Sequence, residues 1–244
     1  LNRLLMKAID YPIIGKYLEG KINPHECYRL WEYHCKGFGQ PCRDLLPDDV
    51  TRKTKKSIQS VMSKMITNKR DRLLIKITGW SRIGFLSKIF EDAKFIHIMR
   101  DGRAVTNSMI NVDFWWGWRG PGNWRWGELT ESQKGEWGKY NRSFIILAAI
   151  EWKILMDALE KAKNYINPNN FLEVKYEDIC NSPITIFKEV LEFCHLEWYV
   201  DFERAVKEFD LKNTNEKWQK ELTVEQKSNL EEFLQDYLKR YNYV

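Results

Sequence analysis

The segment KFIHIMRDGRAVTNSM, residues 94–109, constrains the fold most, because a short apolar strand pattern runs directly into a turn and then a helical pattern. In a parallel sheet, such a junction places the residue that ends the strand at the ligand-binding edge, beside the unpaired amides of the next helix. Arg100 holds this position, and Ser108 follows two turns into the helix on roughly the same face. A guanidinium and a hydroxyl in this arrangement can hold a phosphate group. The alternative is that Arg100 and Asp101 pair with neighbours and that Ser108 is a small buried residue.

The surrounding sequence alternates between strand and helix patterns. LLIKIT (73–78) predicts a strand, SRIGFLSKIF (81–90) a helix, and KFIHIM (94–99) a second strand, which is the spacing of a βαβ unit with a parallel sheet. Farther on, residues 143–165 predict a long helix buried in its first half, and residues 171–178 predict a strand. Ser182 and Pro183 are an expected N-cap and first-turn proline, and Thr223 with Gln226 predicts a capping box for a last helix ending near Arg240. We therefore expect an α/β fold.

Length and composition narrow the possible functions. The 244 residues, 43% of them hydrophobic, fit one domain spanning 1–244. The formal charge of +5 favours a mildly anionic partner but is too small to predict nucleic-acid binding, and a predicted basic helix at 53–67 is best explained as a solvated face. Five widely spaced cysteines without a CxxC pair indicate a reduced compartment and no zinc site. No apolar run predicts a membrane span, and we expect a cytoplasmic location.

A tryptophan-rich segment follows the helix of the opening motif. DFWWGWRGPGNWRWGEL, residues 113–129, interleaves aromatic residues with glycine and proline, so we expect a loop that carries function or packs as a lid. Aromatic faces suit sugars and apolar acceptors alike. The tryptophans either line an acceptor groove or pack against the sheet; they are Trp115, Trp116, Trp118, Trp124 and Trp126.

Four segments together carry a resemblance to a known family. KFIHIMRDGRAVTNSM resembles the 3′-phosphate-binding segment of sulfotransferases that use 3′-phosphoadenosine 5′-phosphosulfate (PAPS), in which an arginine closes a strand and a serine follows eight positions later. LLIKITG resembles the preceding strand of that family, and FLEVKYEDICNSP resembles its strand and turn. NEKWQKELTVEQKSNLEEFL resembles the C-terminal segment of bacterial members. The resemblance implies a three-layer sandwich with a central parallel sheet flanked by helices, like P-loop nucleotide hydrolases.

The resemblance also implies a reaction and a set of site residues. PAPS would donate a sulfuryl group to a hydroxyl or amine, leaving adenosine 3′,5′-bisphosphate, with no metal. The acceptor would be a small molecule, a lipid or a glycan, bound by Trp115, Trp116, Trp118 and Trp124. Arg103 would add a cation near the phosphates unless it is simply solvated. The nucleotide would be bound by Arg100, Ser108, Tyr176, Lys217 and Trp218. The alternative for Tyr176 is a tyrosine of the core, and the alternative for Lys217 and Trp218 is an ordinary pair of residues flanking a helix.

The catalytic base is where this sequence departs from cytosolic members of the family. Those members carry a histidine two residues after the lysine that Lys76 matches, whereas Thr78 stands here. Golgi-type members take a glutamate from the region after the first helix, which implies Glu26 as the base and Lys76 as a cation for the sulfate oxygens. His25, Glu32 and His34 in the same stretch, and Asp113 before the tryptophans, are alternative bases. Glu26 could equally be a surface or helix-capping carboxylate.

The start of the family pattern has no counterpart in this sequence. The family opens with a strand and a glycine-rich loop that wraps the 5′-phosphosulfate, followed at once by a helix that residues 1–9 resemble. We therefore expect the strand and the loop to be missing from this sequence rather than from the natural protein.

Two other functions remain open. One is a P-loop kinase or other nucleotide phosphotransferase on a similar sheet, although the sequence contains no G-x-x-x-x-G-K-[ST] motif. The other is a noncatalytic glycan-binding module built on the tryptophan-rich segment.

Overall fold

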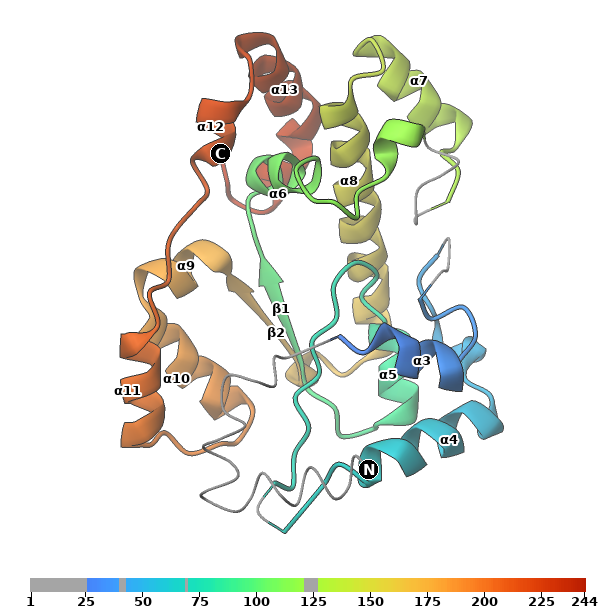
Figure 1. The fold of residues 1–244 in the computed structure, drawn as a ribbon, viewed down its shortest axis with the longest axis vertical. Helices are drawn as coiled ribbons and strands as arrows, with labels where there is room; N and C mark the ends of the chain where they lie inside the picture. The colour runs from blue at the N-terminus through green and yellow to red at the C-terminus, as the bar shows by residue number, and fades with distance from the viewer. Residues whose placement is uncertain (1–25, 40–42, 69, 121–126) are drawn as a thin grey trace. The chain divides into compact units, whose positions relative to one another are not determined.

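The computed structural model describes residues 26–39, 43–68, 70–120 and 127–244 (Figure 1). The chain divides into two compact units, residues 1–93 and 94–244. The single domain expected over residues 1–244 stays a prediction. The helix expected at residues 1–9 lies outside the described residues.

The described part of the first unit is helical. Buried aromatic and aliphatic side chains hold it together: Trp31 stacks on Phe38 with ring centroids 4.9 Å apart, and Phe38 meets Phe85 edge-on at 6.0 Å. Ile58 and Met62, one helical turn apart, form the buried stripe of the predicted basic helix. This helix is confirmed, but it ends at Ser63 rather than at Thr67. The elements are α3 (Tyr28–His34), the 3₁₀ turn η1 (Pro47–Asp49), α4 (Arg52–Ser63) and α5 (Ile83–Ile89).

The predicted strand at 73–78 is wrong for the described structure. This segment runs without regular secondary structure, and Leu74 within it is 95% exposed. A strand forms only where a neighbouring strand supplies hydrogen-bonding partners, however strong the local β propensity. Within the described ranges no strand pairs with residues 73–78.

The second unit contains a small parallel sheet and most of the helices. The strands are β1 (Phe95–Met99) and β2 (Phe171–Lys175). The 3₁₀ turns are η2 (Gly117–Arg119), η4 (Lys163–Tyr165) and η5 (Pro168–Asn170). The helices are α6 (Gly102–Met109), α7 (Glu131–Lys139), α8 (Phe144–Ala162), α9 (Tyr176–Asn181), α10 (Pro183–Phe193), α11 (Val200–Glu208), α12 (Lys217–Glu221) and α13 (Val224–Arg240).

The two strands pair in parallel and in simple register, from Phe95 opposite Phe171 to Met99 opposite Lys175. The predicted partner of β1 was the segment 73–78, so the βαβ unit expected over residues 73–99 is not formed by the described residues. The strand predicted at 171–178 is confirmed, but it ends at Lys175 because α9 begins at Tyr176. Arg100 and Tyr176, which directly follow the two strands, therefore lie at the same edge of the sheet.

Helix α8 forms the core of this unit. Its first half is buried on almost every side, as its apolar sequence predicts, and it packs against α6 and α13 (Figure 1). Leu230, Leu234 and Leu238 give α13 a single buried stripe. The start of α6 approaches α8 so closely that a Cβ at Gly102 would lie 2.9 Å from the ring of Trp152. Glycine is therefore the residue that fits at this strand-to-helix turn.

The helix ends confirm one predicted cap and modify another. Thr223 and Gln226 form the expected capping box at the start of α13. Ser182 occupies the N-cap position of α10 and Pro183 its first turn, but the Ser182 side chain makes no capping hydrogen bond. The architecture is therefore α/β with a small parallel sheet. Among the described residues, no helix combines the length and apolar composition needed to cross a membrane.

Candidate functional site

Polar residues from several segments of the second unit meet at the carboxyl edge of the sheet. Arg100 leaves β1 and donates from Nε to Asn215 Oδ1 at 2.8 Å and from Nη2 to Thr214 Oγ1 at 3.0 Å. Its guanidinium carbon lies 4.5 Å from the ring centroid of Tyr176, the first residue after β2. The Tyr176 hydroxyl donates to the Lys212 carbonyl at 2.7 Å. The predicted residues Arg100 and Tyr176 are thus brought together, and the segment 212–215 lies against both.

A second ring of contacts surrounds this group. The Glu177 carboxylate accepts from the Asp101 backbone amide at 3.1 Å, from the Asn215 side-chain amide, and from the Tyr243 hydroxyl at 3.2 Å. Burial and then the nearby Glu177 charge raise the pKa of Tyr243, so its hydroxyl remains a hydrogen-bond donor. Glu177 therefore links the two strand ends to the C-terminal segment.

Arg103 is not the solvated cation that its place in the turn suggested. Its guanidinium pairs with Asp101 at 2.7 Å and with Glu231 at 3.3 Å, and only 13% of its side chain is exposed. Burial opposes its charge, but the hydrogen bonds and charge of Asp101 outweigh that effect and raise the pKa of Arg103. Asp101 also caps α6 by accepting from the Arg103 backbone amide at 2.9 Å. This pair holds the strand-to-helix turn behind Arg100.

The other predicted nucleotide ligands are more dispersed. Ser108 is exposed in the second turn of α6, so the alternative of a buried small residue is wrong. Lys217 is exposed at the start of α12. Trp218 beside it is only 5% exposed, and the Arg103 guanidinium lies 4.9 Å from its ring centroid. The structure therefore uses Trp218 to hold α12 against α6.

In the first unit, the two predicted catalytic residues form an ion pair. Lys76 Nζ lies 3.1 Å from Glu26 Oε1, and the Thr78 hydroxyl lies 2.9 Å from each oxygen of the same carboxylate. Lys76 is not buried, since 70% of its side chain is exposed, whereas the Glu26 side chain is 20% exposed. A partly shielded carboxylate such as Glu26 can take a proton from a bound acceptor. An exposed ammonium such as Lys76 can attract an anionic ligand to the same place.

Two of the alternative bases, Glu32 and His34, are hydrogen-bonded to other parts of the first unit. Glu32 accepts the backbone amides of Gly37 at 2.8 Å and Gly39 at 2.7 Å, which closes the turn after α3. His34 Nδ1 lies 2.6 Å from Ser57 Oγ. Asp113 is exposed, and His25 lies outside the described residues. Among the candidates that the structure describes, Glu26 is the one with a recorded contact to Lys76.

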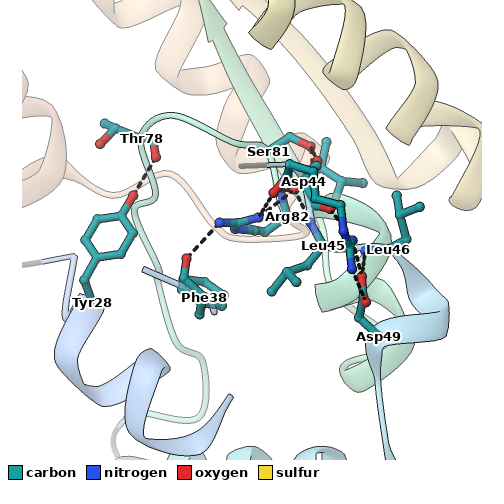
Figure 2. A network of polar contacts seen from close by, with 11 residues as sticks. Tyr28, Phe38, Asp44, Leu45, Leu46, Asp49, Thr78, Ser81 and Arg82 are labelled. Carbon is teal, nitrogen blue, oxygen red and sulfur yellow. Dashed lines mark hydrogen bonds and ion pairs between the residues drawn. The ribbon is translucent and has the colours of Figure 1, made fainter. Parts of the chain in front are cut away.

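A buried polar network fixes the loop that follows Thr78 (Figure 2). Asp44 Oδ1 accepts from the Arg82 backbone amide at 3.0 Å and from its guanidinium at 3.3 Å, and Asp44 Oδ2 accepts from Ser81 at 2.7 Å. Arg82 also donates to the Phe38 carbonyl at 2.7 Å. The network ties the residues before α5 to the segment after α3.

The tryptophan segment divides into a buried and an exposed part. Trp115 is 8% exposed, and its Nε1 donates to the buried Glu151 of α8 at 3.1 Å. Trp116 and Trp118 are 51% and 56% exposed, and the Arg119 guanidinium lies over both rings, at 5.1 and 4.7 Å. Trp115 is thus buried, as the packing alternative expected, but it packs against α8 rather than against the sheet. Trp116 and Trp118 are exposed. Trp124 and Trp126 lie outside the described residues.

Comparison with known protein families identifies the chain. The model of the sulfotransferase family matches residues 22–199, well over half of the sequence. The chain belongs to the sulfotransferase family. Family membership makes sulfuryl transfer the general activity of this sulfotransferase-family chain, as the resemblance of its motifs implied. No curated protein and no solved structure gives a significant match.

Several contacts in this sulfotransferase-family chain carried no clear sequence signal. Thr214 and Asn215 contact Arg100 from more than a hundred residues away, in a polar stretch without periodicity. Asp44 and Arg82, which form the buried ion pair, are 38 residues apart. Glu177 likewise contacts residues that are distant in sequence, Asp101 and Asn215. Among the residues that the structure describes, no cluster of three or more metal-ligating side chains occurs.

Proposed function

We propose that this protein is a PAPS-dependent sulfotransferase that transfers the sulfuryl group to a hydroxyl or amine by in-line displacement. The observation that carries the proposal is the guanidinium of Arg100 at the carboxyl end of β1, held over Tyr176 by Thr214 and Asn215. We further propose that the chain forms one sulfotransferase domain, with the three-layer, P-loop-like architecture of the family.

The residues around Arg100 fit a phosphorylated adenine nucleotide chemically. A guanidinium recognises phosphate oxygens through several N–H donors in one plane, and the Thr214 hydroxyl can share the same anion. The aromatic ring of Tyr176 suits an adenine base, while Ser108 and Lys217 provide an exposed hydroxyl and an exposed cation. We propose that Arg100 and Ser108 bind the 3′-phosphate, which distinguishes this donor from ordinary adenine nucleotides, and that Lys217 and Trp218 belong to the same nucleotide-binding group.

In the transfer step, Glu26 takes the proton of the acceptor as the acceptor atom attacks sulfur. The bond from sulfur to the bridging phosphate oxygen breaks, and adenosine 3′,5′-bisphosphate leaves. Lys76 stabilises the negative charge on the sulfuryl oxygens, because its ammonium is exposed to an incoming ligand while paired with Glu26. Sulfuryl transfer resembles phosphoryl transfer in relying on positioning and charge stabilisation, so this set of residues provides the chemistry without a metal.

The acceptor contacts are assigned to the exposed part of the tryptophan segment. Trp116 and Trp118 present large aromatic faces, which suit a small molecule, a lipid or a glycan. Trp115, the residue before Trp116, is fixed by its hydrogen bond to Glu151, and Trp115 and Trp124 are proposed as further acceptor contacts on sequence grounds.

Calorimetric titration with adenosine 3′,5′-bisphosphate tests the proposal. Arg100→Ala removes charge-assisted hydrogen bonds worth about 1.5–3 kcal/mol each, so we expect affinity to fall by about 10- to 100-fold or more. Arg204→Ala is the matched control, because Arg204 is an exposed arginine paired with Asp201 on α11. The control should bind as the wild type does.

Three results would overturn parts of the proposal. Thermal stabilisation by ATP but not by the bisphosphate would favour the phosphotransferase alternative. Stabilisation by a glycan panel alone would favour the noncatalytic binding module. Unchanged bisphosphate affinity in a folded Arg100→Ala protein would show that the nucleotide binds elsewhere.

A further inference from the structure

The Glu26 carboxylate is contacted by two side chains that differ in length and branching. Lys76 reaches one oxygen at 3.1 Å through a long, mostly exposed side chain. Ion pairs of that kind fix geometry weakly, because two flexible side chains must be ordered in water. Thr78, by contrast, places one hydroxyl 2.9 Å from both oxygens, and its branched Cβ restricts its side chain to few rotamers.

Thr78 is itself held in place from the same segment that carries Glu26. The Tyr28 hydroxyl donates to the Thr78 carbonyl at 2.6 Å, and Figure 2 shows the phenol pointing at that oxygen. Tyr28 begins α3, two residues after Glu26, and its ring lies against the buried Phe38 with centroids 6.1 Å apart. The side chain of Tyr28 therefore contacts Thr78, and the side chain of Thr78 contacts Glu26, so that residues 26–28 and 76–78 are joined by both contacts.

We infer that Thr78 is a positioning residue that orients the Glu26 carboxylate for proton transfer from the acceptor. The inference rests on the proposed function, in which Glu26 is the base. A glutamate has three side-chain torsions, and a hydroxyl shared between its oxygens fixes the plane of the carboxylate. Thr78 keeps its own proton throughout, and the acceptor proton ends on Glu26. Cytosolic members of the family carry a catalytic histidine at the position of Thr78. In this chain, Thr78 instead orients the Glu26 carboxylate, which another segment contributes.

The test compares Thr78→Val, which keeps the branched shape but loses the hydroxyl, with Thr78→Ser, which keeps the hydroxyl. The probe reaction is hydrolysis of PAPS, with water as acceptor, followed by release of adenosine 3′,5′-bisphosphate. A small misplacement of a catalytic group can cost about 100-fold, so we expect Thr78→Val to lower kcat by about 10- to 100-fold. KM for PAPS and the affinity for the bisphosphate should stay at the wild-type values, and Thr78→Ser should recover most of kcat.

The outcomes separate this inference from the proposed function. If the wild type neither binds the bisphosphate nor hydrolyses PAPS, the proposed function fails. If Glu26→Gln keeps full activity, the base is another group and the inference fails with that assignment. If Glu26→Gln is inactive but Thr78→Val keeps wild-type kcat, the inference alone fails. Loss of kcat in Thr78→Ser equal to that in Thr78→Val would also refute it, because the hydroxyl would then not be the group that matters.

Discussion

Replacing Asp44 with alanine should destabilise the first unit strongly. The Asp44 and Arg82 side chains are only 7% and 3% exposed, and their ion pair is 3.3 Å long. Asp44 additionally accepts the backbone amides of Leu45 and Arg82 and the hydroxyl of Ser81. The substitution leaves a buried guanidinium and three further donors without this acceptor.

The structure sets the expected magnitude. Breaking a buried pair by removing one partner costs about 3–5 kcal/mol in free energy of unfolding, because the remaining charge stays buried. Arg82 keeps the carbonyls of Phe38 and Arg43 as acceptors, which places the expected cost near 3 kcal/mol. Asp44→Asn retains an oxygen that can accept the backbone amides but loses the charge, so its cost should lie between those of the wild type and the alanine variant.

Hydrogen exchange read by mass spectrometry localises this effect. Amides of residues 43–49 and 81–89 should lose protection in Asp44→Ala, while those of α8 in the second unit should not. With a urea m-value of about 1–3 kcal/mol per molar, the midpoint for the first unit should fall by about 1 M or more. Glu91→Gln is the control, since it removes the carboxylate charge from the exposed contact with Lys55 and should leave the midpoint unchanged. A cost below about 1 kcal/mol for Asp44→Ala would refute the argument, because the guanidinium would then be reaching water.

Two further predictions concern the second unit. Trp115→Phe removes the indole donor from buried Glu151 and should cost about 1–3 kcal/mol of unfolding free energy in urea titration; a change near zero would show that the loop is not anchored there. Hydrogen bonding by His97 and the charge of Lys163 lower the pKa of Glu173 from its ordinary 4.5, so its ionised form stabilises the fold above that pH. Wild type should therefore exceed Glu173→Gln in stability at pH 6, and the difference should vanish as the pH falls below about 4.5 through the lowered pKa; a difference that persists at low pH would contradict this.

Sequence reasoning succeeded where local signals and burial pattern agree. The strand-to-helix junction at Arg100 and the capping box at Thr223 depend on residues within a few positions of one another. Helix α8 was predictable because a run of apolar residues long enough for a helix must be buried somewhere. In each case the information lies within one segment.

It failed where a partner elsewhere in the chain decides the outcome. The apolar pattern of 73–78 meets the requirements of a strand but finds no pairing strand among the described residues. Trp115 and Trp116 are neighbours of the same type, yet one is buried against Glu151 and the other faces outward. A loop has no periodicity from which to read this difference, so only the tertiary contact with α8 distinguishes them.

The contact between Glu26 and Thr78 shows how a departure from a family pattern becomes informative once the structure is known. In the sequence, Thr78 was noted only because it stands where cytosolic family members carry a histidine. Glu26 was one of several acidic or histidine residues in its stretch that could serve as the catalytic base. The structure gives Glu32 and His34 other partners and brings Glu26 onto the threonine and Lys76 together. A base and its supporting hydroxyl contributed by two segments have no fixed spacing in sequence, so their pairing could be recognised only in the folded chain. Thr78→Val distinguishes the two roles of this side chain: a residue that merely fills space would tolerate the isosteric change, and one that orients a base would not.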